Sequence, residues 1–260
     1  MEIGIALFAH FPFEEIVEVY KKHGINHTFI GSETKEFDKV MQLFSDNGII
    51  CDSLHAPFNN INDMWKEDDE AANAMLLRLK DSVDKCAKFS IPNTVVHISS
   101  KIPMPEITEK GVKRFEELFN YAKEKGVLIA LENQRFLENI DFFMKRYQDL
   151  VFCWDSGHEN CFTDGVDFLS LYGERLKMLH LHDNNCVYDG DEHLLPFDGK
   201  IDFQRASDHL SRLNYQGTLM LEVSKFSTSN GEKIYENLSL DEYIGKAKKA
   251  LLKLLDMISK

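Results

Sequence analysis

The segments VLIALEN (residues 127–133), LVFCWD (150–155) and KMLHLHD (177–183) decide the fold of this chain. Each is a short run of aliphatic and aromatic residues that leads into a carboxylate or a histidine. Such near-continuous apolar runs are typical of parallel strands that are buried on both faces. Further runs of the same kind begin at Ile3, His27, Ile49, Thr94 and Thr218. Together these runs predict eight strands.

Amphipathic stretches separate the predicted strands. FEEIVEVYKKHG (13–24) and FEELFNYAKEKG (115–126) repeat apolar residues at helical spacing, and each closes with basic residues and a glycine, as helices commonly do. Strands that alternate with such helices predict a parallel sheet covered by helices. Eight repeats predict a single (β/α)8 TIM barrel domain over residues 1–260. The alternative is an open doubly wound sheet, but no Gly-rich phosphate fingerprint follows any strand.

Composition narrows the class of protein. A chain of 260 residues with 43% hydrophobic content can bury one large core. Its 43 acidic residues against 30 lysines and arginines give a formal charge of −13. This charge repels polyphosphates, so it disfavours a nucleic acid partner and favours a small ligand that is held by local chemistry.

The cysteines and the chain ends indicate the compartment. The five cysteines form no CxxC pair, as expected of reduced thiols inside a cell. The first residues lack the basic region and cleavage site of a signal peptide, and no apolar run approaches the roughly 20 residues of a membrane span. We therefore expect a cytoplasmic protein without a membrane segment. The terminal helix from Leu240 could serve as the face of a homo-oligomer.

Residues able to bind metals stand at or near the ends of six predicted strands. They are His55, His97, Glu132, Asp155, His180 and Glu222. In a barrel these strand ends converge on one mouth, where the catalytic residues of this fold collect. Any one of them alone could be an ordinary strand-end polar group. A buried carboxylate is costly unless it is paired or holds a metal, so six ligands in phase predict a divalent metal site.

Three further candidates follow the strand ends. His158 lies in WDSGH, and Asp191 with His193 lies in the long segment 182–202, a length that is usually functional in a compact domain. Five imidazoles and four carboxylates suffice for one to three divalent ions. Because no thiolate is among them, the set is typical of a catalytic site rather than a structural one.

The motifs LHAPF, VVHIS, LEN, WDSGH, LHLHD, DEHLLPFDGKIDF and LEV in combination resemble the xylose-isomerase-like TIM barrels. That superfamily includes sugar-phosphate isomerases and epimerases, inosose dehydratase and endonuclease IV, and the resemblance runs from the third predicted strand to the eighth. It implies one divalent ion, Mn, Zn, Co or Mg, held by Glu132, Asp155, His180 and Glu222. A set of nine residues, which adds His55, His97, His158, Asp191 and His193, matches the trinuclear zinc site of endonuclease IV.

One ligand has an alternative. His180 and His182 point to the same side of their strand because side chains alternate with a period of two. We prefer His180, since the HxxD spacing to Asp183 resembles the commoner pattern of the superfamily.

The resemblance implies an isomerase or epimerase that acts on a small sugar or sugar phosphate through an ene-diolate intermediate. Glu132 and Glu222 would serve as ligands and as the acid and base that move the proton. The remaining predicted contacts, to the substrate or to further ions, are His55, His97, His158, Asp191 and His193, with His182, Arg135, Lys225 and His10 as additional substrate contacts.

Three other functions stay open from the sequence. One is a dehydratase that acts on a polyol, and another is a multi-zinc phosphodiesterase that cleaves DNA at abasic sites. A barrel without catalytic activity is the third, since fold alone does not determine function. The formal charge of −13 disfavours the phosphodiesterase, which would need a basic rim to hold a duplex.

Overall fold

The computed structural model describes residues 1–7 and 11–259, and it confirms all eight predicted strands. The strands are β1 (Ile3–Leu7), β2 (His27–Gly31), β3 (Ile50–His55), β4 (Asn93–Val96), β5 (Leu128–Glu132), β6 (Val151–Asp155), β7 (Leu176–His180) and β8 (Leu219–Val223). The α-helices are α1 (Phe13–His23), α2 (Phe37–Asp46), α3 (Asp69–Phe89), α4 (Glu109–Lys125), α5 (Leu137–Arg146), α6 (Ser156–Phe162), α7 (Phe168–Tyr172), α8 (Phe203–Arg212) and α9 (Leu240–Ile258). Two short 3-10 helices are η1 (Ile61–Trp65) and η2 (Gly173–Arg175).

The strands form one sheet in the order β7-β6-β5-β4-β3-β2-β1-β8. The register is parallel, for example with Gly4 beside Met220 and Thr94 beside Ile129. A parallel bridge between Leu181 and Leu221 joins the chain just after β7 to β8. Because strands that follow one another in the chain are neighbours and the two ends of the order meet, the fold is the predicted (β/α)8 TIM barrel and not a doubly wound sheet.

Two compact units can be distinguished in the chain. The first unit comprises Met1–Thr28, Asp38–Ile50 and Trp154–Lys260, and the second unit comprises Phe29–Phe37 and Cys51–Cys153. Every strand pairing named above lies within one of them. A single domain over the whole chain stays a prediction.

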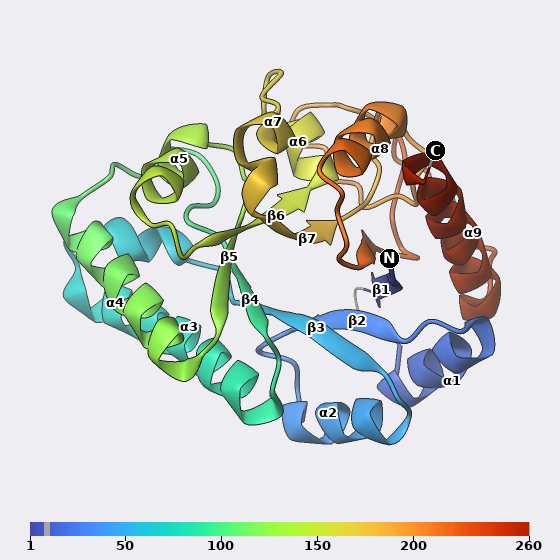
Figure 1. Ribbon diagram of the computed structural model, residues 1–260, viewed down its shortest axis with the longest axis horizontal. Helices are drawn as coiled ribbons and strands as arrows, with labels where there is room; N and C mark the ends of the chain where they lie inside the picture. The colour runs from blue at the N-terminus through green and yellow to red at the C-terminus, as the bar shows by residue number, and fades with distance from the viewer. Residues whose placement is uncertain (8–10, 260) are drawn as a thin grey trace. The chain divides into compact units, whose positions relative to one another are not determined.

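In the first unit, helices from the two ends of the chain pack together. Figure 1 shows α1 in blue beside α9 in red, and α8 also packs on α9. Helix α9 begins with a capping box in which Ser239 and Glu242 satisfy each other's backbone N–H groups. Near its start, Asp241 accepts hydrogen bonds from Lys22 at 2.7 Å and pairs with His23 at 2.8 Å. The chain ends are thus tied to each other.

In the second unit, α3 and α4 lie side by side, and η1 packs on both (Figure 1). Trp65 of η1 is buried against Phe115 and Phe143, and its indole N–H donates to the Ile98 carbonyl at 2.7 Å. Buried Arg114 of α4 donates to the carbonyl of Met64 at 2.8 Å. Trp65 is therefore a core residue that secures the segment after β3.

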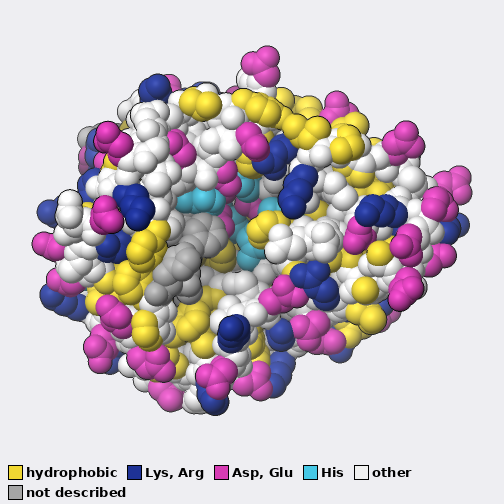
Figure 2. Space-filling model, turned by 180° about the vertical axis from the view of Figure 1, so that it is seen from behind, with side chains coloured by type: hydrophobic (Ala, Val, Ile, Leu, Met, Phe, Trp, Pro, Cys, Tyr) yellow, Lys and Arg dark blue, Asp and Glu magenta, His cyan; other side chains and the backbone are white. Residues whose placement is uncertain are grey.

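Charged side chains of both signs are spread over the face of the molecule that Figure 2 shows. On the face shown in Figure 2, the lysines and arginines among the described residues stand singly among acidic side chains. This agrees with the formal charge of −13, and the expectation against a nucleic acid partner stays a prediction. None of the helices that the structure describes is both long and apolar enough to cross a membrane.

Candidate metal centre

Three predicted ligands of the second unit come together at the ends of adjacent strands. His55 ends β3, His97 follows β4, and Glu132 ends β5. Glu132 is only 1% exposed, and its Oε2 lies 2.6 Å from His97 Nε2 and 3.3 Å from His55 Nε2. One ligand atom from each residue lies within 4.8 Å of the other two. This spacing suits three ligands of one ion.

Neighbouring polar groups orient the imidazole rings of His55 and His97. His55 Nδ1 lies 2.8 Å from the Ala56 carbonyl, and because a carbonyl can only accept, Nδ1 donates this hydrogen bond. A hydrogen bond from one ring nitrogen to a backbone carbonyl is typical of histidines that bind a metal through the other nitrogen. Gln134, which the sequence analysis did not predict, lies with Nε2 at 3.2 Å from His97 Nε2. Its place two residues after Glu132 was the available signal, because alternate residues of an extended chain share a side.

An aromatic ring borders this cluster. Phe58 stacks on His97 with ring centroids 4.8 Å apart and meets His55 edge-on at 5.4 Å. Its side chain is 43% exposed. The motif LHAPF thus supplies both a ligand and an exposed apolar surface next to it.

In the first unit, the WDSGH motif joins the end of β6 to the start of α6. Asp155 caps the helix, since its Oδ1 accepts from the His158 backbone N–H at 2.6 Å. His182 places Nε2 at 3.1 and 3.2 Å from the two Asp155 oxygens. Gly157 permits this contact, because a Cβ at that position would lie 1.8 Å from the His182 ring. The glycine of the motif is therefore required by packing.

Asp191 lies among three imidazoles of the same unit. The Nε2 atoms of His158, His182 and His193 lie 3.4, 3.6 and 3.1 Å from its carboxylate oxygens. Burial disfavours its ionisation, but the charges of His158 and His193 hold the pKa of Asp191 well below its usual value. Burial likewise opposes the charged form of His193, yet Asp191 outweighs it and raises the pKa of His193 to about 9.

The first unit also pairs two predicted central ligands. His180 ends β7 and places Nδ1 at 3.0 Å from Glu222 Oε2 on neighbouring β8. His193 Nδ1 lies 3.0 Å from the Glu222 carbonyl, so this nitrogen carries a proton, and Nε2 faces Asp191. Both Glu222 and His180 are buried.

The donor chemistry of these clusters fits a divalent ion. Within the first unit, single ligand atoms of His182, Asp191 and His193 lie within 4.8 Å of one another. His182 Nδ1 is buried and has no hydrogen-bond partner among the described residues. Imidazoles and carboxylates suit zinc, cobalt and manganese.

Of the four residues that were predicted as additional substrate contacts, those that the structure describes differ in burial and in hydrogen-bond partners. His182 is fully buried in the cluster around Asp155 and does not lie at an exposed rim. Lys225 is buried, and its ammonium donates to the carbonyls of Tyr235 at 3.2 Å and Glu236 at 3.4 Å. Arg135 is partly exposed, and His10 lies outside the described residues. The substrate contacts predicted for these residues stay predictions.

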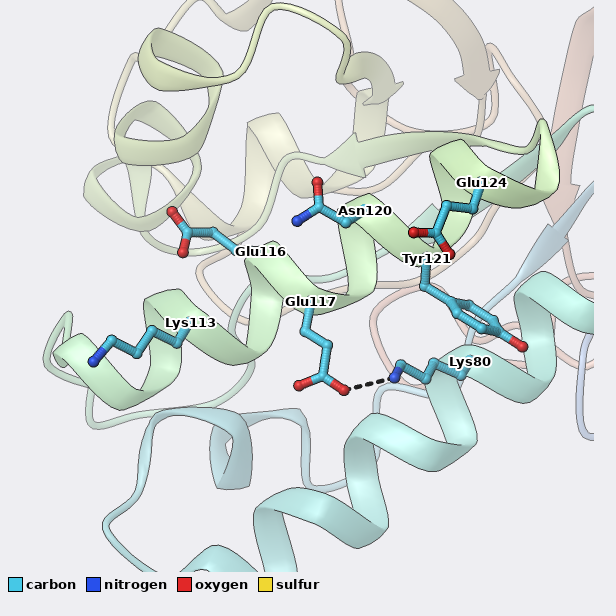
Figure 3. Close-up of a pocket in the computed structure, with 7 residues that line it drawn as sticks. All are labelled: Lys80, Lys113, Glu116, Glu117, Asn120, Tyr121 and Glu124. Carbon is cyan, nitrogen blue, oxygen red and sulfur yellow. Dashed lines mark hydrogen bonds and ion pairs between the residues drawn. The ribbon is translucent and has the colours of Figure 1, made fainter.

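A separate pocket in the second unit has a different character. Figure 3 shows this pocket between side chains of α3 and α4. Its lining is mostly charged, and Lys80 Nζ forms an ion pair with Glu117 Oε1 at 2.6 Å. Its lining residues are Lys80, Lys113, Glu116, Glu117, Asn120, Tyr121 and Glu124. The pocket brings no predicted ligand together, and we assign it no function.

The chain is similar in sequence to two uncharacterised proteins. The chain is 31% identical over 161 residues to an uncharacterised protein of Sinorhizobium fredii, covering 56% of this chain and 51% of that protein. It therefore spans about half the length of that relative. An uncharacterised protein of Methanocaldococcus jannaschii is 25% identical over 198 residues, covering 72% of this chain and 75% of its own length.

Solved structures share the whole fold at low sequence identity. A D-tagatose 3-epimerase-like protein superposes with a TM-score of 0.78 at 20% identity, covering 100% of this chain and 98% of its own. D-psicose 3-epimerase from Clostridium cellulolyticum superposes with a TM-score of 0.78 at 16% sequence identity, and the match covers 99% of each chain. The IolI protein with a bound zinc atom superposes with a TM-score of 0.75 at 18% sequence identity, and the match covers 99% of this chain and 98% of IolI. These likenesses establish the fold.

The family model of the xylose isomerase-like TIM barrel matches residues 10–241. That match takes in all strands from β2 to β8 and every candidate ligand described above. The chain belongs to the xylose isomerase-like TIM barrel family.

Proposed function

We propose that this protein is a divalent-metal-dependent isomerase or epimerase that acts on a small sugar or sugar phosphate. The observation that carries the proposal is the pairing of a buried strand-end glutamate with a histidine, once in each unit. Glu132 lies 2.6 Å from His97, and Glu222 lies 3.0 Å from His180. Family membership supports the proposal, as do proteins of the same fold that are named sugar epimerases.

The central ligands that we propose are Glu132, Asp155, His180 and Glu222. Glu132, Asp155 and His180 end β5, β6 and β7, Glu222 is the last residue but one of β8, and the four strands belong to one sheet. The C-terminal strand ends of a (β/α)8 barrel face a common mouth, where active sites of this fold are built. When bound, a divalent ion would stabilise negative charge on substrate oxygens beside the reacting carbon. The further candidates His55, His97, His158, Asp191 and His193 would hold additional ions or the substrate.

Proton transfer would be the work of the two glutamates. Glu132 would remove the proton from the carbon next to the substrate carbonyl, which leaves an ene-diolate, and Glu222 would return a proton to complete an epimerisation. Burial suits this role because it keeps bulk water away from the proton that the carboxylates would move. His158 would orient a substrate oxygen, while His182 holds Asp155 in place.

The direct test is solvent exchange. We would incubate the protein, loaded in turn with Mn²⁺, Co²⁺, Zn²⁺ or Mg²⁺, with ketoses and aldoses, with and without phosphate, in D₂O. Proton NMR should show deuterium at the carbon next to the carbonyl, together with an epimer or isomer of the sugar. Exchange in the wild type that survives unchanged in Glu132→Gln and Glu222→Gln would contradict the assigned roles.

A metal-cluster phosphodiesterase is the second candidate function. The ligands around Asp191 favour it, because His158, His182 and His193 are more donors than a single central ion requires. It predicts three zinc ions per chain by elemental analysis and cleavage of a duplex that contains an abasic site. One ion per chain and an intact duplex would leave the sugar reaction, and release of water from a polyol would instead identify a dehydratase.

A further inference from the structure

The segment between β7 and α8 carries Asp191 and His193 in a conformation that its own residues do not favour. Four non-glycine residues in it have positive φ: Cys186 at 56°, Asp189 at 62°, His193 at 47° and Phe197 at 76°. Side chains of L-residues are disfavoured there, and such residues persist where surrounding contacts hold them. The contacts that hold this segment therefore decide where its two ligands lie.

A single buried carboxylate accepts hydrogen bonds from several backbone N–H groups of the segment. Asp183, which is 0% exposed, accepts backbone N–H groups on both oxygens. Oδ1 accepts from Asn184 at 2.8 Å and Ile201 at 3.0 Å, and Oδ2 accepts from Phe197 at 3.0 Å and Gly199 at 2.9 Å. One side chain thus fastens both ends of the segment.

The backbone of Asp183 also forms hydrogen bonds with the middle of the same segment. Its N–H donates to the Leu194 carbonyl at 2.8 Å, and its carbonyl accepts from the Leu194 N–H at 2.9 Å. Leu194 directly follows His193, whose carbonyl accepts from Ser224 N at 3.2 Å and Ser227 Oγ at 3.0 Å. The ligand-bearing turn is therefore held between Asp183 and the chain after β8.

Gly199 shows how closely the segment wraps this carboxylate. A Cβ at residue 199 would lie 2.4 Å from Asp183 Oδ1 and 2.4 Å from the Asn184 carbonyl oxygen. Any side chain there would push the backbone away from Asp183. The segment needs both the carboxylate and the glycine.

We propose that Asp183 is the positioning residue that sets Asp191 and His193 in their places. It acts through the backbone of the segment, since its carboxylate bonds to backbone N–H groups and not to the reacting substrate. The metal-binding part of this inference rests on the proposed function, while the positioning of His193 can be tested without any metal.

The variant Asp183→Asn tests the positioning role. An asparagine offers one acceptor oxygen, so two of the four N–H groups would face an amide nitrogen that cannot accept. The matched control is Asp198→Asn in the same segment, where the carboxylate bonds to Tyr235 at 2.8 Å and Lys246 at 2.6 Å. Gly199→Ala disturbs the same contact from the opposite side and serves if Asp183→Asn does not fold.

The first measurement uses the metal-free protein. In wild type and Asp198→Asn, NMR should show the His193 ring proton on Nδ1, protected by its bond to the Glu222 carbonyl, and slow exchange of the amides of Phe197, Gly199 and Ile201. In Asp183→Asn or Gly199→Ala, both signatures should be lost. Loss of amide protection with the His193 ring signal unchanged would overturn the proposal, as would unchanged amide protection.

The second measurement is titration with Co²⁺ alone, followed by its visible absorption. Affinity should fall roughly 10- to 100-fold in Asp183→Asn, as for other residues that support metal ligands, and stay at the wild-type value in Asp198→Asn. Wild-type affinity and spectrum in Asp183→Asn would overturn the proposal. If the wild type binds no Co²⁺, the proposed metal function fails, and the metal-free NMR result still decides the positioning role.

Discussion

Glu132 Oε2 lies 2.6 Å from Nε2 of His97, and both side chains are buried in the second unit. A carboxylate in such a place is stable only with a partner that offsets its lost hydration. A divalent ion, a protonated imidazole or a substrate proton can each fill that place. The pair is therefore suited to binding a cation and to moving a proton.

Glu132→Gln keeps the size of the side chain and removes its charge. We expect the affinity for Co²⁺ to fall at least tenfold and kcat on the sugar substrate to fall about 10²- to 10⁴-fold, because the variant loses a ligand and a general base. The same change at exposed Glu124 is the control and should alter neither value. Full turnover by Glu132→Gln after loss of its metal would rule out the double role.

The pH dependence of stability should report on His193 in the metal-free protein. Its pKa is raised from 6.5 to about 9, since the charge of Asp191 outweighs burial. A raised pKa in the folded state adds stability that is complete below pH 6.5 and is lost as the pH rises toward about 9. The free energy of unfolding in urea should therefore decrease across this range, and the decrease should be smaller in His193→Gln. An identical slope in that variant would contradict the assignment.

Metal binding near Asp191 should release protons. A protonated His193 cannot bind a cation, so the ion must displace the proton that the raised pKa of His193 retains at neutral pH. Calorimetry of Zn²⁺ binding at pH 7 in buffers of different ionisation enthalpy measures this release. We expect His193→Gln to release fewer protons per ion than the wild type, and equal release would show that the ion leaves His193 protonated.

Gly157→Ala should disturb the first unit more than most alanine substitutions. The added Cβ would lie 1.8 Å from the His182 ring, so the ring or α6 must shift. We expect a loss of about 1–3 kcal/mol in the free energy of unfolding, as for other overpacked sites. Gly31→Ala, which meets no atom within 4 Å, is the matched control. Equal stability of the two variants would argue against the packing seen between Gly157 and His182.

Phe58 offers a test of substrate contact that leaves the ligands in place. Its exposed ring stacks on His97 and presents an apolar face beside the second-unit cluster. We expect Phe58→Leu to raise KM for the sugar about tenfold, because leucine would offer a bound substrate less apolar surface than the ring, and to keep the Co²⁺ stoichiometry. Phe58→Tyr retains the ring and should keep a KM near that of the wild type. A lower metal content in Phe58→Leu would instead show that the ring supports His97.

The order of the elements and the positions of the proposed ligands at or near strand ends were predictable because their signals are local. An apolar run such as VLIALEN becomes a buried strand whatever its partners are, and Glu132 ends it by position alone. The same reasoning placed Asp155, His180 and Glu222 at strand ends, and the structure has the first two there and Glu222 one residue before the end of β8. The local structure of WDSGH also follows from its own residues, because an aspartate three residues before His158 can cap the helix that carries this histidine.

The partners of these side chains were decided only by the tertiary structure. The sequence could not show that His182 would be buried against Asp155, that Trp65 would pack in the core, or that Gln134 would reach His97. Nor could it show that Asp183 would collect four backbone N–H groups from residues up to 18 positions away. Strand periodicity depends on neighbours along the chain, whereas the path of the segment between β7 and α8 depends on contacts that exist only once the strands have assembled.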